Sequence, residues 1–522
     1  MKTVSRKSYL LRFFLFFCTF PVFAQELPSG LGDLERYVNE SMQKWKVPGL
    51  ALGIVHKGKL VYAKGFGVRE MGKNELVDAQ TIFAVGSNTK AFTSLMVSQM
   101  AAEGKLSLED PVTKHLPHFT LNNPNATALV TIRDLLCHRI GLGTWHGDLV
   151  AWGSRYSRAE ILERYRHIKP VYGFRSGFGY QNVPFMAAGE IAGQVAGLRW
   201  DDWVAEKIFR PLGMSRSATK HQDLASFENV ARPHTIDVDG KMLSIPYRNI
   251  DNIGPAGSIT SSVGDMARWL ILQADSLGKV DGKEVFKPNV IRRTHYPNNL
   301  IAYMPYDNPT FPATHMGGYA LGWFVRDYHG KVLFEHGGGV DGMISQTGFM
   351  PELNLGWVIL SNLDTGNSLP TALMYHIIDA YLKVPYKDWS QYFLEEQKEQ
   401  DAQNVRMWQT ELNRKKTDKK PSFSIEALIG VYENEGYGEV EIVMSGEEMT
   451  LNLLAHPGVF GTLEHWNNDR FLVRFNDPVF GRTFVSFKSE KGDVKSFSLQ
   501  IRPDFLDPLV YTFAKKAKTE GG

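Results

Sequence analysis

The order of strand and helix signals along the chain limits its fold more than any other feature. Residues 50–55 and 60–63 flank the turn Lys57-Gly58 and predict a β-hairpin near the start of the 522-residue chain. Much later, further strands are predicted at residues 321–326, 332–335, 347–350 and 357–361. The segments between are mostly helical in pattern. We therefore predict an α+β fold in which one antiparallel sheet carries helices on its faces.

Three helices of the middle region have recognisable ends. They are predicted at residues 87–103, 131–137 and 262–272. The first is closed by Gly104, and the other two begin at Thr131 and Ser262, each followed three residues later by an aspartate that can cap the helix.

The first 24 residues predict a secretory signal peptide. A basic start, the apolar run Phe13–Phe17 and the ending Val22-Phe23-Ala24 are features of such a segment, with cleavage expected before Gln25. The apolar stretch is broken by Arg12 and Pro21 and is too short to span a bilayer. We expect an exported protein, periplasmic or secreted, with no stable membrane span after cleavage.

A change of composition divides the rest of the chain. Residues 397–420 are rich in charged and amide side chains, which predicts an exposed helix running into a linker. Short alternating strands follow, at residues 439–444, 449–454, 471–475, 483–488 and 495–501. The predicted organisation is a signal peptide (1–24), an α+β domain (25–385), a charged helical linker (386–422) and a small all-β domain (423–522).

Charge and cysteine content exclude some partners. The formal net charge of +2 includes four basic and no acidic residues of the predicted signal peptide, and without those four charges the remainder is −2. Such a protein has no general attraction to nucleic acid, so we expect a small-molecule or peptide substrate. Cys18 falls in the signal peptide. Cys137 is then a single thiol in an apolar run, expected to be buried and structural.

The segment Ser87-Asn88-Thr89-Lys90 carries the strongest chemical signal. It follows an apolar run and a glycine and opens the first predicted helix. A spacing of three places Ser87 and Lys90 on one helix face, about one turn apart. A serine hydroxyl is a weak nucleophile, and a lysine that burial shifts toward its neutral form can take its proton. Taken alone, the same pattern is also that of a helix cap followed by a surface charge.

Two later segments add polar groups suited to a site. Tyr180-Gln181-Asn182 follows a glycine-rich stretch and precedes an apolar helix, a position typical of an active-site loop. His336-Gly337-Gly338-Gly339 comes directly after the strand 332–335, where glycines would let a substrate carbonyl approach a backbone N–H. The structural alternatives are an aromatic loop anchor and a flexible strand exit.

Together, Ser-x-x-Lys near the start, Tyr-x-Asn in the middle and His-x-Gly on a late strand resemble the serine β-lactamase and penicillin-binding protein superfamily. The resemblance is closest to class C-like β-lactamases, DD-peptidases and related esterases, and it covers residues 31–383. It implies a β-lactamase/transpeptidase-like fold for the catalytic domain. The all-β domain resembles the lipocalin-like domains of some members, which can cover the cleft or mediate assembly, so a homo-oligomer is one expectation.

The resemblance implies a role for each residue. Ser87 attacks a carbonyl and forms an acyl-enzyme, while Lys90 and Tyr180 share the transfer of protons. Asn182 hydrogen-bonds the substrate amide or the lysine. The backbone N–H groups of Ser87 and Gly339 bind the oxyanion. No metal and no cofactor is expected.

The triplet His336-Gly337-Gly338 departs from the superfamily pattern, which has Lys-Thr/Ser-Gly there. The usual lysine presents a fixed positive charge to the substrate carboxylate, whereas a histidine near neutral pH is only partly charged and Gly337 has no hydroxyl. The departure weakens the expectation of efficient β-lactam hydrolysis. His-x-Gly is familiar instead among D-amino-acid peptidases and esterases of the superfamily.

Other catalytic classes fit less well. The glycines after His336 also invite an α/β-hydrolase interpretation, but the nearest candidate for a Gly-x-Ser-x-Gly elbow, residues 213–217, lacks the second glycine. The 15 histidines include no His-Glu-x-x-His pair, and Pro117 interrupts the pair His115 and His118.

Three functions remain open. The first is a hydrolase, in which water resolves an acyl-enzyme formed from an ester or a small peptide or amide. The second is an acyltransferase that passes the acyl group to an alcohol or amine of a bulky apolar acceptor held in an aromatic cleft. The third is a β-lactamase or a penicillin-binding sensor that acylates and stalls. The aromatic residues expected to wall the site are Trp145, Trp152, Tyr156, Tyr172, Phe174, Phe178, Tyr303 and Tyr306.

Overall fold

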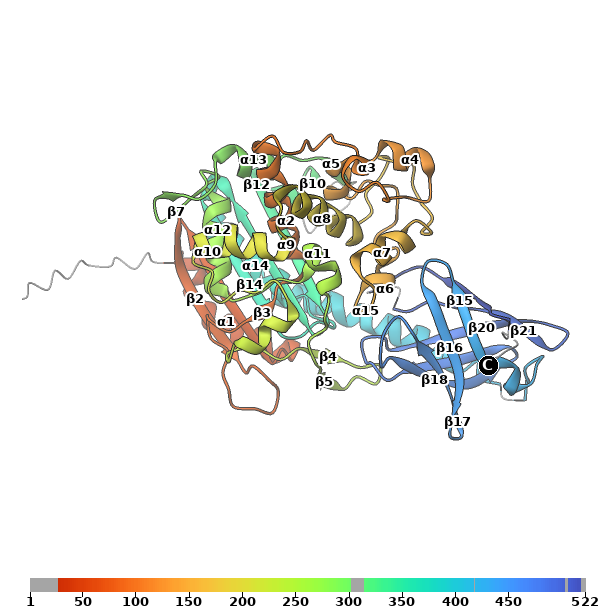
Figure 1. Ribbon diagram of the computed structural model, residues 1–522. Helices are drawn as coiled ribbons and strands as arrows, with labels where there is room; N and C mark the ends of the chain where they lie inside the picture. Colours follow the sequence, from red (N-terminus) through yellow and green to blue (C-terminus); the bar gives the residue numbers. More distant parts are fainter. Residues whose placement is uncertain (1–26, 302–313, 417, 503–505, 518–522) are drawn as a thin grey trace, which may run out of the picture.

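The computed structural model describes residues 27–301, 314–416, 418–502 and 506–517. The predicted signal peptide lies outside these residues, as do Tyr303 and Tyr306. The described chain forms an α+β domain with an antiparallel sheet and a closed β-barrel after it, so the predicted fold class is confirmed (Figure 1).

An eight-stranded antiparallel sheet forms the centre of the first domain. In spatial order its strands are β2 (Lys59–Gly67), β1 (Gly49–His56), β14 (Leu355–Ser361), β13 (Met343–Met350), β12 (Lys331–Val340), β11 (Phe324–Tyr328), β10 (Gly317–Tyr319) and β9 (Asn299–Ile301). The β1–β2 hairpin turns at Lys57 and Gly58, which both have positive φ. Because β1 pairs with β14 from Leu50↔Ser361 to His56↔Leu355, the early hairpin and the late strands share one sheet, as predicted.

The segments between these strands supply most of the helices. The helices are α1 (Leu34–Trp45), η2 (Gly86–Asn88), α2 (Thr89–Ala102), α3 (Val112–His115), α4 (Pro124–Leu129), α5 (Ile132–Leu136), α6 (Asp148–Ala151), α7 (Arg158–Tyr165), α8 (Val183–Ala196), α9 (Trp200–Val204), α10 (Arg210–Leu212), α11 (Gly254–Gly257), α12 (Val263–Ala274), α13 (Pro288–His295), α14 (Leu369–Leu382) and α15 (Trp389–Leu412). Short two-stranded pairs join β3 (Phe83–Ala84) to β6 (Thr260–Ser261), β4 (His234–Ile236) to β5 (Met242–Ser244), and β7 (Lys279–Val280) to β8 (Lys283–Glu284). Thr131 caps α5 in a capping box with Asp134, and Ser262 caps α12, as the sequence predicts.

Helices cover both faces of the sheet, so β1 is buried on both sides. Leu50, Leu52 and Ile54 belong to the core that contains α1, α14 and the start of α15. Ala51 and Val55 belong to the core that contains α2, α8 and α12. Successive side chains of a strand point to opposite faces, so β1 joins the two helical layers.

Strand β12 is longer than predicted, and this difference affects the site. The prediction that His336–Gly339 follow the strand is wrong, because β12 contains them and its pairing with β13 continues to Val340↔Met343. Pairing with β11 stops at Phe324↔Glu335. Residues 336–340 therefore have a strand partner on one edge only.

The second domain is a closed eight-stranded barrel. Its strands are β15 (Gly430–Asn434), β16 (Gly438–Ser445), β17 (Glu448–Leu453), β18 (Phe460–Asn467), β19 (Arg470–Phe475), β20 (Arg482–Glu490), β21 (Asp493–Leu499) and β22 (Tyr511–Lys515), and β15 pairs with β22 to close it. Packed rings, including Tyr432, Phe497 and Phe513, occupy the barrel core. The sequence did not reveal β15, β18 and β22.

The predicted linker segment contains the long helix α15. Its first turns bury Trp389 and Leu394 in the core of the first domain, and the remainder runs toward the barrel. None of the helices within the described residues combines the length and apolar character needed to cross a membrane.

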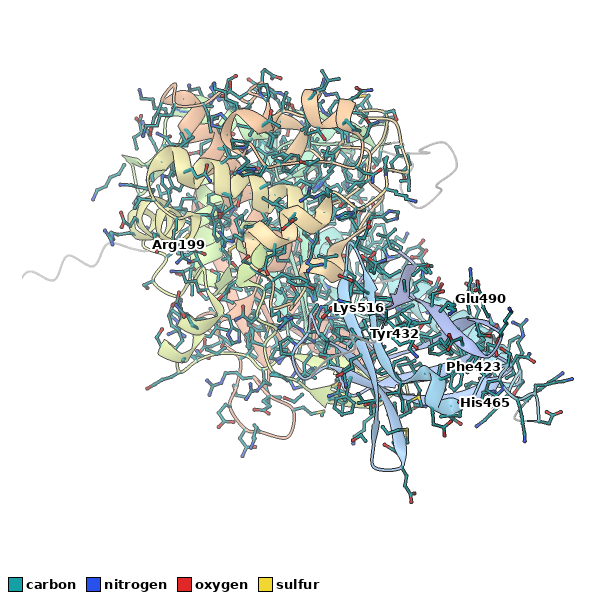
Figure 2. All side chains as sticks on the ribbon, turned by 45° about the vertical axis from the view of Figure 1, so that its right-hand side comes forward. Arg199, Phe423, Tyr432, His465, Glu490 and Lys516 are labelled. Carbon is teal, nitrogen blue, oxygen red and sulfur yellow. The ribbon has the colours of Figure 1, made fainter. Side chains whose placement is uncertain are left out.

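Buried polar contacts hold the barrel against the first domain. Arg248 lies between Asp341 of the first domain and Asp477 of the barrel, with Nη2 2.5 Å from the Asp477 carboxylate. The Tyr156 hydroxyl donates to the Tyr437 carbonyl oxygen at 3.0 Å. The barrel stands to one side of the first domain, beside α6 and α7 (Figure 1), with Arg199 at the opposite side (Figure 2).

Replacing Arg248 tests this interface. We expect Arg248→Ala to lower the free energy of unfolding by about 3–5 kcal/mol, because it leaves two carboxylates without their cation, one of them almost completely buried. Urea denaturation measures the change. Arg36→Ala removes an exposed pair with Asp33 and should change the free energy of unfolding little, because solvent screens an exposed ion pair. Equal losses in the two variants would contradict a stabilising role for the interface ion pairs.

Candidate active site

Ser87 lies in the short helix η2, which packs directly against β12. A side chain on Gly86 would meet the Gly339 nitrogen at 2.7 Å, and one on Gly338 would meet the Val85 carbonyl oxygen at 2.0 Å. Only glycine at these positions lets the strand and the turn approach so closely. The packing brings Gly338 and Gly339 next to the turn that holds Ser87.

Lys90, in the first turn of α2, is completely buried. Its Nζ lies 2.9 Å from Ser87 Oγ, 2.6 Å from Asn182 Oδ1 and 2.8 Å from the Ala256 carbonyl oxygen. Burial lowers the pKa of Lys90 to about 7. In its neutral form, the amine can donate its two N–H groups to Asn182 and Ala256 and keep its lone pair for the Ser87 hydroxyl. This arrangement suits a base that takes the serine proton.

Tyr180 faces the same amine, with its ring centre 4.7 Å from Lys90 Nζ. Its backbone is held by Thr144, whose hydroxyl accepts from Tyr180 N, and by Trp145, whose N–H donates to Tyr180 O. The hydroxyl is buried without a hydrogen-bond partner among the described residues, and burial raises its pKa despite the neighbouring Ser87 hydroxyl. Tyr180 is therefore a neutral phenol at neutral pH, suited to relay a proton rather than to act first as a base.

Asn182 links Lys90 to Asp148, a residue that the sequence did not reveal. Asn182 Oδ1 accepts from Lys90, and its Nδ2 donates to Asp148 Oδ2 at 2.7 Å. Burial raises the pKa of Asp148, in α6, to about 8. Asp148 thus fixes which side of the Asn182 amide faces the lysine.

His336 lies within β12 and is buried among the rings of the site. Its Nδ1 lies 2.5 Å from the Gly337 carbonyl oxygen and its Nε2 lies 3.0 Å from the Tyr319 hydroxyl. These contacts fit a neutral ring that donates from Nδ1 and accepts at Nε2. Burial and the neighbouring Lys90 lower its pKa to about 3. The expectation of a partly charged histidine is wrong, because the ring is uncharged at neutral pH.

A cluster of aromatic rings surrounds these groups and gives the site a low local polarity. Each member has its ring centre within 6.5 Å of at least two others, and the members are His138, Phe178, Tyr180, Tyr319, Phe324 and His336. No sequence motif points to His138, Tyr319 or Phe324. Their contribution follows from packing between distant segments.

The aromatic residues predicted to wall the site have different positions. Phe178 belongs to the ring cluster, but Trp152 and Tyr156 lie at the barrel interface, where the carbonyl oxygen of Trp152 contacts a histidine of the barrel. Tyr172 is exposed, and Phe174, which the Arg175 guanidinium contacts, packs in part against the core. Trp145 lies beside the site, since its N–H donates to the Tyr180 carbonyl oxygen. That these residues together line a substrate cleft stays a prediction.

Two other sequence expectations concern thiols and metals. Cys137 is a buried free thiol, and burial raises its pKa to about 12, which leaves it protonated. Within the described ranges, no three His, Cys, Asp or Glu side chains are grouped in a way that could hold a metal ion.

The two domains match different protein families. Residues 34–382 match the family described as Beta-lactamase. Residues 414–511 match a family described as a domain of unknown function, DUF3471.

Individual relatives agree with this assignment. The chain is 26% identical over 468 residues to a protein named unguisins hydrolase ungD from Aspergillus violaceofuscus, covering 84% of this chain and 82% of the relative. It is 26% identical over 337 residues to protein flp of Staphylococcus aureus, covering 64% and 63%. Among solved structures, an octameric penicillin-binding protein homologue from Pyrococcus abyssi shares the fold with a TM-score of 0.60 and 22% identity, covering 93% of this chain and 100% of that one.

A pair of glycine variants tests the packing of β12 against Ser87. Gly338→Ala would place a methyl group 2.0 Å from the Val85 carbonyl oxygen, so the strand must move away from the turn. We expect the reaction of Ser87 with a serine-directed phosphonate to slow by about 100-fold. Gly337→Ala would meet the end of the flexible Gln346 side chain at 3.2 Å and the Ser345 carbonyl oxygen at an ordinary 3.8 Å, so it should change the rate little. Equal losses in both variants would contradict the packing argument.

Proposed function

The chain belongs to the Beta-lactamase family of serine hydrolases, and we propose that it is an exported enzyme that forms an acyl-enzyme on Ser87 with small ester or amide substrates. The observation that carries this proposal is the 2.9 Å contact between Ser87 Oγ and the fully buried Lys90 Nζ. Export is proposed from the signal peptide that the sequence predicts in residues 1–24.

The proposed reaction has two half-reactions. Ser87 Oγ forms a bond to the substrate carbonyl carbon while Lys90 Nζ takes the hydroxyl proton, which passes to the leaving alcohol or amine, with Tyr180 as relay. The bond to the leaving group then breaks and leaves an ester on Ser87. Water then forms a bond to the carbonyl carbon of this ester while Lys90 Nζ takes a water proton. The bond between that carbon and Ser87 Oγ breaks, the proton returns to Oγ, and the carboxylic acid is released.

The free edge of β12 supports binding of an extended substrate. Residues 336–340 have no strand partner on the β11 side, so their backbone groups can pair with the main chain of a peptide-like substrate. Gly339 lies against Gly86, next to Ser87. We propose that the N–H groups of Ser87 and Gly339 bind the oxyanion, as the superfamily pattern implies.

The neutral state of His336 favours substrates without a carboxylate at this position. A fixed cation would compensate a substrate carboxylate, but His336 is uncharged and Gly337 offers no hydroxyl. We therefore place ester or amide hydrolysis ahead of the roles of β-lactamase or penicillin-binding sensor.

The relative named a hydrolase supports hydrolysis, and the octameric homologue supports the proposal that this chain forms a homo-oligomer.

Labelling of Ser87 tests the mechanism. A fluorescent phosphonate followed by peptide mass mapping should label Ser87 in the wild-type protein, and Ser87→Ala should abolish labelling. Lys90→Ala should slow ester turnover by about three orders of magnitude or more, because it removes the base. Ser94→Ala, on the same helix but outside the site, should react like the wild type. Turnover by Ser87→Ala at the wild-type rate would refute the proposal.

Transfer to an acceptor is the second candidate, and the buried ring cluster around Lys90 favours it because it restricts water. Product analysis with a simple ester donor and added alcohols or amines separates the two reactions. We expect free acid as the main product with short alcohols. A transfer product that dominates when the acceptor is a bulky apolar alcohol would instead identify an acyltransferase.

A further inference from the structure

The buried polar groups behind Asn182 continue from the first domain into the barrel. Lys90 contacts Asn182, and Asn182 contacts Asp148. The next residue, Leu149, donates its backbone N–H to Asp507 Oδ2 at 3.1 Å. Asp507 lies between β21 and β22 of the barrel. Two buried carboxyl groups, one from each domain, therefore lie together at α6, behind the catalytic lysine.

The two carboxyl groups differ in their hydrogen bonds. Asp507 accepts from the Tyr511 hydroxyl at 2.6 Å and from Leu509 N at 2.9 Å, besides the bond from Leu149 N. Asp148 accepts from Asn182 on one oxygen, and its other oxygen has no partner among the described residues. Donors stabilise a carboxylate, so Asp507 is better able to carry a negative charge. Burial raises the pKa of Asp507 to about 6 and that of Asp148, with a contribution from Asp507, to about 8.

The charge on Asp148 affects Lys90. An ionised Asp148 would favour the ammonium form of Lys90, which cannot accept the Ser87 proton. An uncharged Asp148 leaves the effect of burial unopposed and the amine neutral. A carboxylate at Asp507 opposes ionisation of Asp148, because like charges repel strongly in a buried environment.

We propose that Asp507 of the barrel keeps the Asp148 carboxyl protonated and thereby keeps Lys90 in its neutral, basic form. The inference rests on the proposed role of Lys90 as the base. Asp148 and Asp507 are positioning residues, since they act through Asn182 and Lys90. The barrel then sets the pH range in which Ser87 reacts.

The following titratable groups face Lys90, Asp148 or Asp507 and are uncharged at neutral pH. Tyr165 of α7 and Tyr511 of β22 face both carboxyls, and burial raises the pKa of each tyrosine. On the other side of the lysine, burial lowers the pKa values of His138 and His336 and raises that of Tyr180. Among these groups, the charge near Ser87 at neutral pH is therefore set by Lys90, Asp148 and Asp507.

The pH dependence of Ser87 labelling tests the proposal. In the full chain, the rate constant for phosphonate labelling is measured from about pH 5 to about pH 10 and should fall as pH drops through the pKa of Lys90. In Asp507→Asn, Asp148 ionises more readily and raises the pKa of Lys90. The midpoint of the curve of labelling rate constant against pH should therefore move up by about one pH unit. In Asp148→Asn the midpoint should stay or move down, and adding Asp507→Asn to that variant should not move it.

Two further variants keep the test decisive. Tyr511→Phe removes a hydrogen-bond donor that stabilises the Asp507 carboxylate, so its midpoint should move up by a smaller amount. This variant replaces Asp507→Asn if thermal denaturation shows that Asp507→Asn is not folded. Asp477→Asn is the matched control, because it breaks the interface pair with Arg248 without contacting Asp148. Its midpoint should equal that of the wild type.

The outcomes separate this inference from the proposed function. An unchanged midpoint in folded Asp507→Asn or Tyr511→Phe would overturn the inference, as would a loss of rate that is uniform at all pH values. A shift caused by Asp507→Asn that persists in the Asp148→Asn background would also overturn it. If Ser87 is not labelled in the wild-type protein, the proposed function fails instead.

Discussion

A buried lysine held by neutral acceptors is the constraint on which the site depends. Burying an ammonium ion is costly, and an ionised partner would offset that cost but would also remove the basicity of the amine. Here Lys90 comes from α2, Asn182 lies at the start of α8, and the carbonyl oxygen of Ala256 comes from α11. Three helices from separate parts of the chain must pack correctly to place this amine beside Ser87. In the proposed mechanism, the helical layer on this face of the sheet therefore contributes to reactivity as well as to stability.

The sheet contributes a different requirement, which is close approach. Residues 336–340 continue β12 beyond the end of β11 and leave one edge of the strand without a strand partner. Glycine is unfavourable inside strands, but here the missing side chains of Gly338 and Gly86 let β12 lie against the turn that holds Ser87. The glycines reduce the stability of the strand, and in return the free strand edge lies close to Ser87.

Local patterns were predictable from the sequence, and contacts between distant segments were not. The spacing of Ser87 and Lys90 is a property of one helical turn, so its geometry could be stated in advance. The sequence predicts an end of β12 at Glu335 because the glycines that follow have low strand propensity. The pairing with β13 that continues the strand to Val340 depends on a distant segment, so the local pattern does not show it. Asp148 and Asp507 lie far apart in the sequence, and no motif joins them. Similarly, no local pattern shows that the indole N–H of Trp152 donates to Asp341 while its carbonyl oxygen contacts His456 of the barrel.

The position of the barrel contacts connects the two domains chemically. One of them reaches Leu149 of α6, the helix that carries Asp148, and another reaches Arg248, which in turn pairs with Asp341 directly after β12. The interface between the two domains therefore lies next to Asp148, which contacts Asn182 beside Lys90, and next to the end of β12. The barrel core is filled by packed rings, and the contact with α6 is made by Asp507, which lies between two barrel strands. If Asp507 acts as proposed, a substitution in the barrel alters the reactivity of Ser87 without touching the substrate, because it changes the charge of groups that contact Lys90 through Asn182.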